Sequence, residues 1–528
     1  MGKLYGMWWG ASKASRALWR SLSTRRKFIV LLAFLLLAVG DLWGLPSEVT
    51  TAFDASSVYS SLGVLTHFRE AAFDYAYPQV HKILLLPVVG LVMVVTLLLG
   101  GMGRPTGAWP YGLSHPVATI TALFLAGILV SNLMAITALA LAATLGDDDR
   151  DDTSWEFSLL FLAACGPFAY YARTMNYDYP YLFWWALAWL LLWRAVVDGQ
   201  PTRKNLLLSG VFAALAVGAK DQAAGLAVGA AAAVLTIPGD VKTRMQRGLT
   251  WGSAAAATYA LVVLVSPPGR WWYHVTHMDE TLVGAGRADP SQYPLSQLAA
   301  DVAGSLSAVL SWPALALAGV GLFLLLRRRD TPRLAAILLP LGGYALAPIL
   351  STRVGHVRFL MPVALLLVPA LLVAVQAAQR RSRTWATLGL GALLAWRLAF
   401  SWVPMAWLQT FDAKRSLAAD LATYVPPGEV LCYFDEYRLI PNADVYTRYK
   451  LWRPGLSDVS RPAQHIFLPV EPAQTCRRIL TVIDHGPTWQ GLPRVRTWGP
   501  PEWLQARIAA GDVFEPSRSV FAYYLYQN

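Results

Sequence analysis

Long runs of apolar residues recur through most of this chain, and they constrain its fold more than any other feature. Crossing the hydrocarbon core of a membrane takes about 20 residues of helix, and in lipid the backbone polar groups must be satisfied within the segment itself. Most of the runs are long enough and therefore predict membrane-spanning α-helices. The runs are 28–45, 83–99, 117–145, 157–172, 180–197, 206–219, 222–238, 251–267, 303–326, 334–350, 359–378 and 385–404.

Composition agrees with this prediction. Of the 528 residues, 55% are hydrophobic and only 14% are charged, against about 25% charged in soluble domains. The 22 tryptophans suit helices that cross the headgroup region. The net charge of +12 does not indicate a nucleic-acid partner, because the basic residues lie in short clusters between the apolar runs.

Those basic clusters predict the orientation of the chain. Basic residues concentrate in residues 1–27, which contain no acid, and in the segments 203–204, 242–247, 327–333 and 380–383. Basic loops stay on the cytoplasmic side, so we expect all five clusters there.

All five clusters share one side if the run 83–99 is a re-entrant or interface-lying segment. An additional span inside 117–145 would have the same effect, and this alternative stays open.

The predicted fold class is an α-helical polytopic membrane protein of the plasma (inner) membrane, with about 11–13 spans and a small C-terminal α/β domain. Residues 1–27 form a basic cytoplasmic N-terminus, and 28–404 form the transmembrane module with a large outer loop at 46–116. Residues 405–528 form the extracytoplasmic domain. Its expected strands are 430–434, 478–483 and 520–525, and its expected helices are 412–424 and 501–510.

The C-terminal domain also holds two of the three cysteines. Cys432 and Cys476 could form a disulfide outside the cytoplasm, or both could be free thiols.

Ionisable side chains near a membrane are functional candidates because they are costly there unless paired or hydrated. In this chain they gather at the predicted outer ends of the spans, whereas a transporter more often places them near the midplane. We therefore expect a site at the outer membrane surface. The residues concerned are Asp41, Asp54, Asp74, His81, Arg173, Asp178, Lys220, Asp221, His274, His277, Asp279, Glu280, Arg353, His356 and Arg358.

Four stretches give this pattern a family resemblance. They are FDASSVY at 53–59 with YPQVHKILL at 77–85, YARTMNYDYP at 171–180, GVFAALAVGAK at 210–220, and RFLMP at 358–362. In order and sidedness they resemble the GT-C superfamily of membrane glycosyltransferases, in the branch of the protein O-mannosyltransferases and the lipid A aminoarabinose transferase. The family usually has two adjacent acids in the first motif, whereas here Asp54 is followed by Ala55.

The resemblance implies transfer of a sugar from a polyprenyl-phosphate carrier to an extracytoplasmic lipid, glycan or protein acceptor. It implies Asp54 as the general base for the acceptor hydroxyl. Lys220, Arg358 and Arg173 would hold the lipid phosphate. Asp178 would orient the acceptor or carry a metal.

Each role has a simpler alternative. Asp54 could cap a loop helix, and Asp178 could cap the helix before Pro180. Lys220 could extend toward the headgroups or pair with Asp221. Arg173 could pair with Asp178 to hold the hairpin between two helices.

A divalent metal (Mg, Mn or Zn) is a further candidate cofactor. His277 and Glu280 lie beside His274 and Asp279, and together they offer both nitrogen and oxygen ligands. A surface role for these residues is the alternative.

Two other functions compete with the transferase. A transporter or flippase for lipid-linked or anionic solutes would need acids at mid-span, which the runs almost lack. A non-catalytic relative acting in cell-envelope assembly would be compatible with the single acid at Asp54.

Overall fold

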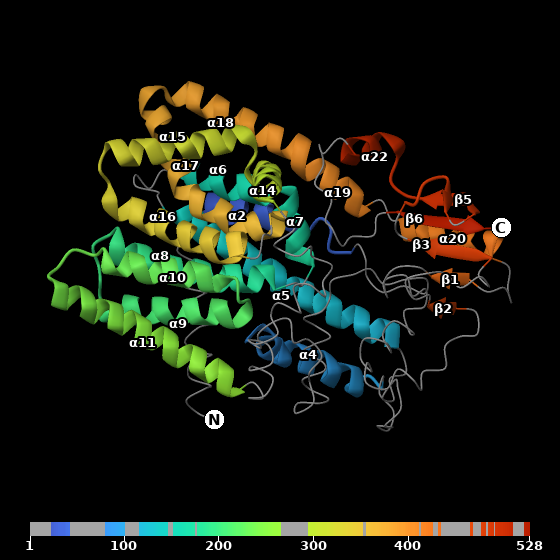
Figure 1. The fold of residues 1–528 in the computed structure, drawn as a ribbon, viewed down its shortest axis with the longest axis horizontal. Helices are drawn as coiled ribbons and strands as arrows, with labels where there is room; N and C mark the ends of the chain where they lie inside the picture. The colour runs from blue at the N-terminus through green and yellow to red at the C-terminus, as the bar shows by residue number, and fades with distance from the viewer. Residues whose placement is uncertain are drawn as a thin grey trace.

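The computed structural model describes an α-helical bundle joined to a small C-terminal sheet (Figure 1). The residues it describes are 23–42, 80–100, 116–145, 152–174, 177–265, 294–351, 355–410, 413–425, 431–433, 465–467, 477–481, 484–489, 491–509 and 522–527.

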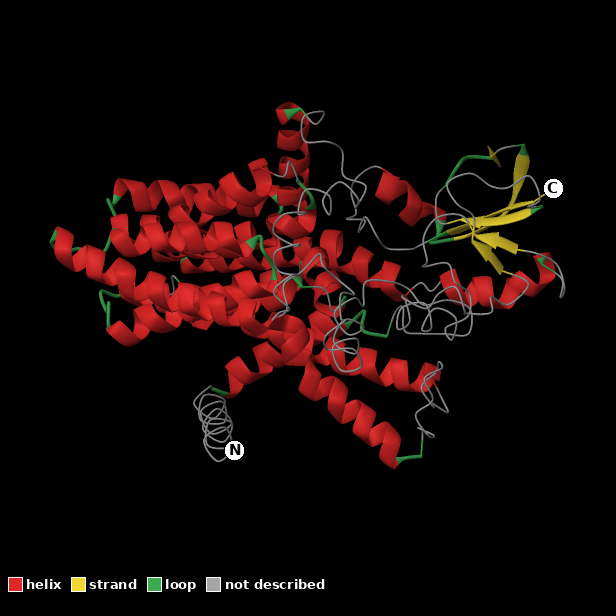
Figure 2. Ribbon diagram, turned by 60° about the horizontal axis from the view of Figure 1, so that its bottom comes forward, coloured by secondary structure: helices red, strands yellow, loops and turns green. Residues whose placement is uncertain are grey.

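Helices account for most of the described chain (Figure 2). Those before residue 300 are α2 (Thr24–Ala38), α4 (Val80–Leu98), α5 (Pro116–Thr144), α6 (Asp152–Ala163), α7 (Gly166–Arg173), α8 (Asp178–Val196), α9 (Arg203–Ala219), α10 (Ala223–Leu235), α11 (Val241–Val265) and α14 (Leu295–Leu310). Those that follow in the bundle are α15 (Trp312–Arg327), α16 (Thr331–Tyr344), η2 (Ala345–Ser351), η3 (Val357–Leu360), α17 (Met361–Arg381), α18 (Arg383–Arg397), η4 (Leu398–Trp402) and α19 (Val403–Thr410).

Five described segments are long and apolar enough to cross a membrane: Val80–Leu98, Thr121–Thr144, Thr331–Leu350, Val357–Arg381 and Arg383–Trp407. The pair α14 and α15 would add a sixth if it counts as one span. The structure thus confirms a mostly helical chain with several helices of membrane-spanning length. The larger number of 11–13 spans stays a prediction.

The predicted run 303–326 is not one straight helix. It is split between α14 and α15, whose axes differ by 94°. Ser311, at the junction, has a backbone φ of 66°. This value lies in the left-handed region, which residues other than glycine rarely adopt. The buried Arg397 donates hydrogen bonds to the carbonyls of Ala308 (3.1 Å) and Val309 at the end of α14. Its guanidinium satisfies carbonyls that the helix end leaves without an intrahelical partner.

The centre of the bundle is α17, whose apolar segment is completely buried. Small residues allow the surrounding helices to come close. Gly225 and Gly229 of α10 face α16, where a Cβ on Gly229 would collide with the carbonyl oxygen of Leu339. Gly321 of α15 packs still closer against the backbone of Ala370 in α17. Such small-residue contacts are typical of helix pairs in membranes, where dispersion contacts replace the hydrophobic driving force.

The C-terminal part contains a six-stranded mixed sheet in the order β2-β1-β3-β6-β5-β4. The strands are β1 (Leu431–Tyr433), β2 (His465–Phe467), β3 (Arg478–Thr481), β4 (Thr488–Trp489), β5 (Leu492–Trp498) and β6 (Tyr523–Gln527), and its helices are α20 (Ala413–Tyr424) and α22 (Glu502–Ala509). The expected strands and helices coincide with β1, β3, β6, α20 and α22. The pairing of Cys432 with Cys476 stays open because Cys476 lies outside the described residues.

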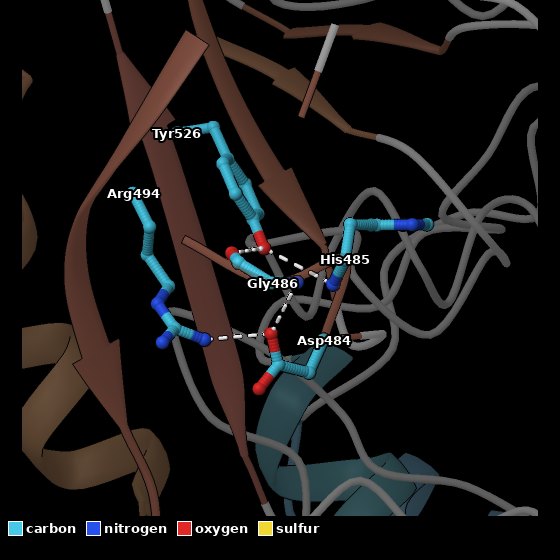
Figure 3. Close-up of polar contacts among 5 residues, drawn as sticks. All are labelled: Asp484, His485, Gly486, Arg494 and Tyr526. Atoms are coloured by element: carbon cyan, nitrogen blue, oxygen red, sulfur yellow. Dashed lines mark hydrogen bonds and ion pairs between the residues drawn. The ribbon is translucent and has the colours of Figure 1, made fainter. Parts of the chain in front are cut away.

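Polar contacts hold this sheet together. The Arg496 guanidinium (2.8 Å) and the Trp498 indole (3.2 Å) both donate to Asp420 Oδ2 of α20, and these hydrogen bonds hold the pKa of the Asp420 carboxyl below its usual value. Figure 3 shows how Tyr526 of β6 contacts the loop before β4. The Tyr526 hydroxyl donates a hydrogen bond to the Gly486 carbonyl of that loop (2.9 Å). Gly486 has a φ of +87°, which glycine adopts without a steric penalty.

Candidate functional site

The two ends of the bundle carry different residues. At one end, Arg25 at the start of α2 forms an ion pair with Glu156 near the start of α6 (2.6 Å). Ser154 of α6 also bonds Gln379 (3.1 Å), next to the basic end of α17. Figure 1 places the α8–α9, α10–α11 and α15–α16 connections at the end of the bundle farthest from the sheet. The basic connections therefore gather at one end, and the site described below lies at the other.

Lys220 and Asp178 meet at this second end because α8, α9 and α10 run alternately up and down. Asp178 is the first residue of α8, and Lys220 is the residue that ends α9 before a short turn into α10. Lys220 Nζ and Asp178 Oδ1 form an ion pair in which both side chains are at least 98% buried. The partner of Lys220 in this ion pair is Asp178, which lies 42 positions earlier in the chain.

Aromatic rings enclose this ion pair. Lys220 Nζ lies 5.4 Å from the centroid of the Tyr181 ring and 5.1 Å from that of Phe359. Cations at such distances from aromatic faces are attracted by the ring quadrupole. The rings also exclude water, which strengthens the electrostatic interactions inside the site.

Arg358 joins the site from η3. Its side chain is buried, and its Cζ lies 5.0 Å from the Phe359 centroid, so the same ring lies close to both Lys220 and Arg358. Arg358 also lies within electrostatic range of Tyr181 and Tyr344. Three of the predicted site residues, Asp178, Lys220 and Arg358, therefore converge.

Lys82 and His81, at the start of α4, are two buried residues that the sequence interpretation left without a role. Lys82 Nζ lies 5.9 Å from the ring of Tyr177, the residue before Asp178, and the His81 ring packs edge-on against Tyr177 at 5.8 Å. A cation at the start of an apolar run, on the same predicted side as Lys220, was the available signal for Lys82.

Arg173 belongs to a neighbouring polar cluster and not to the ion pair. It is fully buried at the end of α7, with its Cζ 5.7 Å from the Tyr170 ring, and it interacts electrostatically with Asp41. Asn132 of α5 donates a hydrogen bond to Asp41 Oδ2 (2.6 Å). The hydrogen-bonded partner of Asp178 is Lys220.

Asp54, His277 and Glu280 lie outside the described residues. Their predicted roles as general base and metal ligands stay predictions. Within the part of the chain that the structure describes, no group of three or more His, Cys, Asp or Glu side chains is placed to hold a metal ion.

One atom of the site stands out chemically. Asp178 Oδ2 is buried, and among the described residues no group donates a hydrogen bond to it. Buried carboxylate oxygens nearly always have a partner, so this oxygen is available to a hydroxyl or an ordered water. Cationic groups beside a carboxylate that can still accept a hydrogen bond suit an anionic ligand that carries hydroxyls.

Comparisons of the chain with protein-family models, curated proteins and solved structures found no match. What the site can do is therefore inferred from its own residues.

Proposed function

We propose that this protein is an integral membrane glycosyltransferase that moves a sugar from a polyprenyl-phosphate donor to an acceptor on the extracytoplasmic side. The observation that carries the proposal is the convergence of Lys220, Arg358 and Asp178. These three residues come from separate helical segments and meet in one buried site lined by Tyr181 and Phe359. Buried cations with aromatic walls suit a lipid-linked phosphate and its sugar ring.

The location of the site supports the orientation. The basic connections lie at the opposite end of the bundle. Basic loops remain in the cytoplasm, so the site would open toward the outer membrane surface. Polyprenyl-phosphate sugars present their headgroups at a membrane surface, and a site at the outer end of the bundle would meet them there.

In the proposed reaction, Lys220 and Arg358 stabilise the negative charge that develops on the phosphate as the glycosidic bond breaks. Lys82 adds a third positive charge near Tyr177. Asp178 Oδ2 accepts a hydrogen bond from a sugar or acceptor hydroxyl. Asp54 takes the proton of the attacking hydroxyl, as the family resemblance implies. Arg173 acts from the adjacent cluster with Asp41, at the end of α7.

The proposal is tested in a strain whose own copy of the gene is deleted and replaced by a copy that carries Asp54→Asn. Mass spectrometry of its cell-surface glycans measures the product. Asp240→Asn, an identical change at an exposed carboxylate in the α10–α11 connection, is the matched control. We expect the glycan product to be lost with Asp54→Asn and retained with Asp240→Asn at equal protein levels. Normal product in the Asp54→Asn strain would refute the assignment of the base.

A transporter or flippase is the second candidate function. Under this function, an inactive variant would also lack the glycan product, because the substrate would never cross the membrane. Purified protein in vesicles separates the two functions, since the transferase turns over donor that is supplied on the same side as the acceptor. A protein that only translocates lipid would not turn the donor over. If the protein binds a polyprenyl phosphate but turns over no sugar-linked form of it, the result would favour a non-catalytic role in cell-envelope assembly.

A further inference from the structure

The helix Arg383–Trp407, composed of α18, η4 and the first part of α19, is the most exposed of the candidate spans, with only 11% of its apolar segment buried. Its large exposed apolar residues recur at helical spacing along one face. They are Trp385 (76% exposed), Leu388 (58%), Trp396 (52%), Phe400 (47%), Val403 (48%) and Trp407 (48%). An apolar stripe of this length on one helix face requires a cover.

The length of this face identifies its cover as lipid. Trp385 and Trp407 are separated by about 33 Å of helix, close to the roughly 30 Å thickness of a bilayer hydrocarbon core. Tryptophan is enriched at the two boundaries of that core. Arg397, the one charged residue between them, is 2% exposed and turns inward to the carbonyls of α14.

Trp407 thus marks the boundary nearer the C-terminal domain, and a second tryptophan lies beside it. Trp503 of α22 is 51% exposed, and its ring centroid lies 6.1 Å from that of Trp407. The next residue, Leu504, is fully buried and belongs to the core of the helical bundle. Leu504 therefore anchors α22 to the bundle and holds Trp503 at the level of Trp407, as the adjacent α19 and α22 in Figure 1 illustrate.

We infer that the C-terminal domain rests on the membrane surface through α22, with the Trp503 side chain inserted among the lipid headgroups beside Trp407. Indole rings favour this zone because their apolar body is buried while the N–H reaches water or a headgroup. The contact would hold the domain beside the end of the bundle that carries Lys220 and Asp178. The inference rests on the proposed membrane location and is independent of the transferase chemistry.

The test measures membrane depth by fluorescence quenching in the full-length protein. Cys432 and Cys476 are replaced by serine, while Cys165 is retained because it is fully buried. Single cysteines introduced by Trp503→Cys, Trp396→Cys and Thr488→Cys are labelled with a small fluorophore and reconstituted into phosphatidylcholine vesicles. Nitroxide lipids quench either near the headgroups or in the middle of the acyl chains. Thr488 is the matched control, since it is exposed and lies on the edge strand β4.

We expect headgroup-level nitroxide to quench the label at position 503 and not the label at 488. The label at 396, halfway along the exposed helix, should be quenched by the mid-chain nitroxide. Equal quenching at 503 and 488 would overturn the docking of α22, even with normal quenching at 396. Absence of quenching at 396 would instead refute the membrane location on which the inference rests.

Discussion

Lys220 caps the C-terminal end of α9 and forms a buried ion pair with Asp178, the first residue of α8, 42 positions earlier in the chain. Asp178 lies at a helix N-terminus, where the helix dipole favours a negative charge, and its ion pair supplies the cation. This contact connects the three helices α8, α9 and α10 at the end of the bundle that carries the candidate site.

The first prediction concerns the stability of this ion pair. Lys220→Met leaves a buried carboxylate uncompensated and should destabilise the protein by about 3–5 kcal/mol. The double variant Lys220→Met with Asp178→Asn removes both charges and should recover much of that loss. Thermal unfolding in detergent measures both effects.

An exposed ion pair provides the comparison for this cycle. Arg496 is 43% exposed and Asp420 is 37% exposed in their ion pair, and Arg496→Gln should cost at most about 1 kcal/mol. Additive losses in the Lys220 and Asp178 double variant would contradict the coupling.

The second prediction concerns the proposed phosphate site. Arg358→Gln removes one buried guanidinium beside Phe359 and should weaken binding of a short polyprenyl phosphate by roughly 10- to 100-fold, the equivalent of a charged hydrogen bond worth about 1.5–3 kcal/mol. Calorimetric titration of the detergent-solubilised protein measures this affinity.

Arg381→Gln is the matched control because Arg381 ends α17, the helix that follows Arg358, at the opposite end of the bundle. Its affinity for the polyprenyl phosphate should equal that of the wild type. Equal weakening in both variants would show that the effect depends on net charge and not on the site.

The third prediction uses two glycines of α15. A Cβ on Gly321 would collide with the backbone of Ala370, whereas a Cβ on Gly319 would meet nothing within 4 Å. Gly321→Ala should destabilise the bundle by about 1–3 kcal/mol through overpacking. Gly319→Ala should be neutral or stabilise it by up to about 1 kcal/mol because alanine has the higher helix propensity. Thermal unfolding of the two variants side by side checks the contrast between them.

The fourth prediction concerns acid sensitivity of the C-terminal domain. Hydrogen bonds from Arg496 and Trp498 hold the pKa of Asp420 below 3.8 in the folded state. A depressed carboxyl pKa stabilises the folded state above the unfolded pKa, and this contribution is lost as the pH falls through the folded value. At pH 7, Asp420→Asn should therefore reduce the amide-exchange protection of β5 relative to the wild type.

This difference in protection should shrink as the pH falls through the lowered pKa of the folded state, because the wild-type carboxyl then becomes protonated as well. Amide-exchange protection of β5 in the Asp484→Asn variant offers a comparison. Asp484 accepts a hydrogen bond from Arg494 (2.6 Å), which lies on β5 like Arg496. A difference at Asp420 that is independent of pH would exclude the ionised carboxylate as its cause.

The sequence alone indicated most of the helical segments, because apolar runs are local properties, although the runs 157–172 and 303–326 are each divided between two helices. Thus α17 (Met361–Arg381) matches the run at 359–378, and the break at Lys220 separates α9 from α10. In the C-terminal domain, the strand-like run at 478–483 became β3. The residue types also indicated that Asp178, Lys220 and Arg358 would lie toward the same end of the bundle.

Only the tertiary structure decided which side chains meet. Lys220 forms a buried ion pair with Asp178, 42 positions away, because the alternation of α8 and α9 brings their ends together. The approach of Lys82 to Tyr177 and the 94° bend between α14 and α15 were likewise absent from the sequence pattern. Hydropathy records how far each segment prefers lipid or protein to water, but it does not record the rotation and neighbours of each helix, which depend on close packing against other helices.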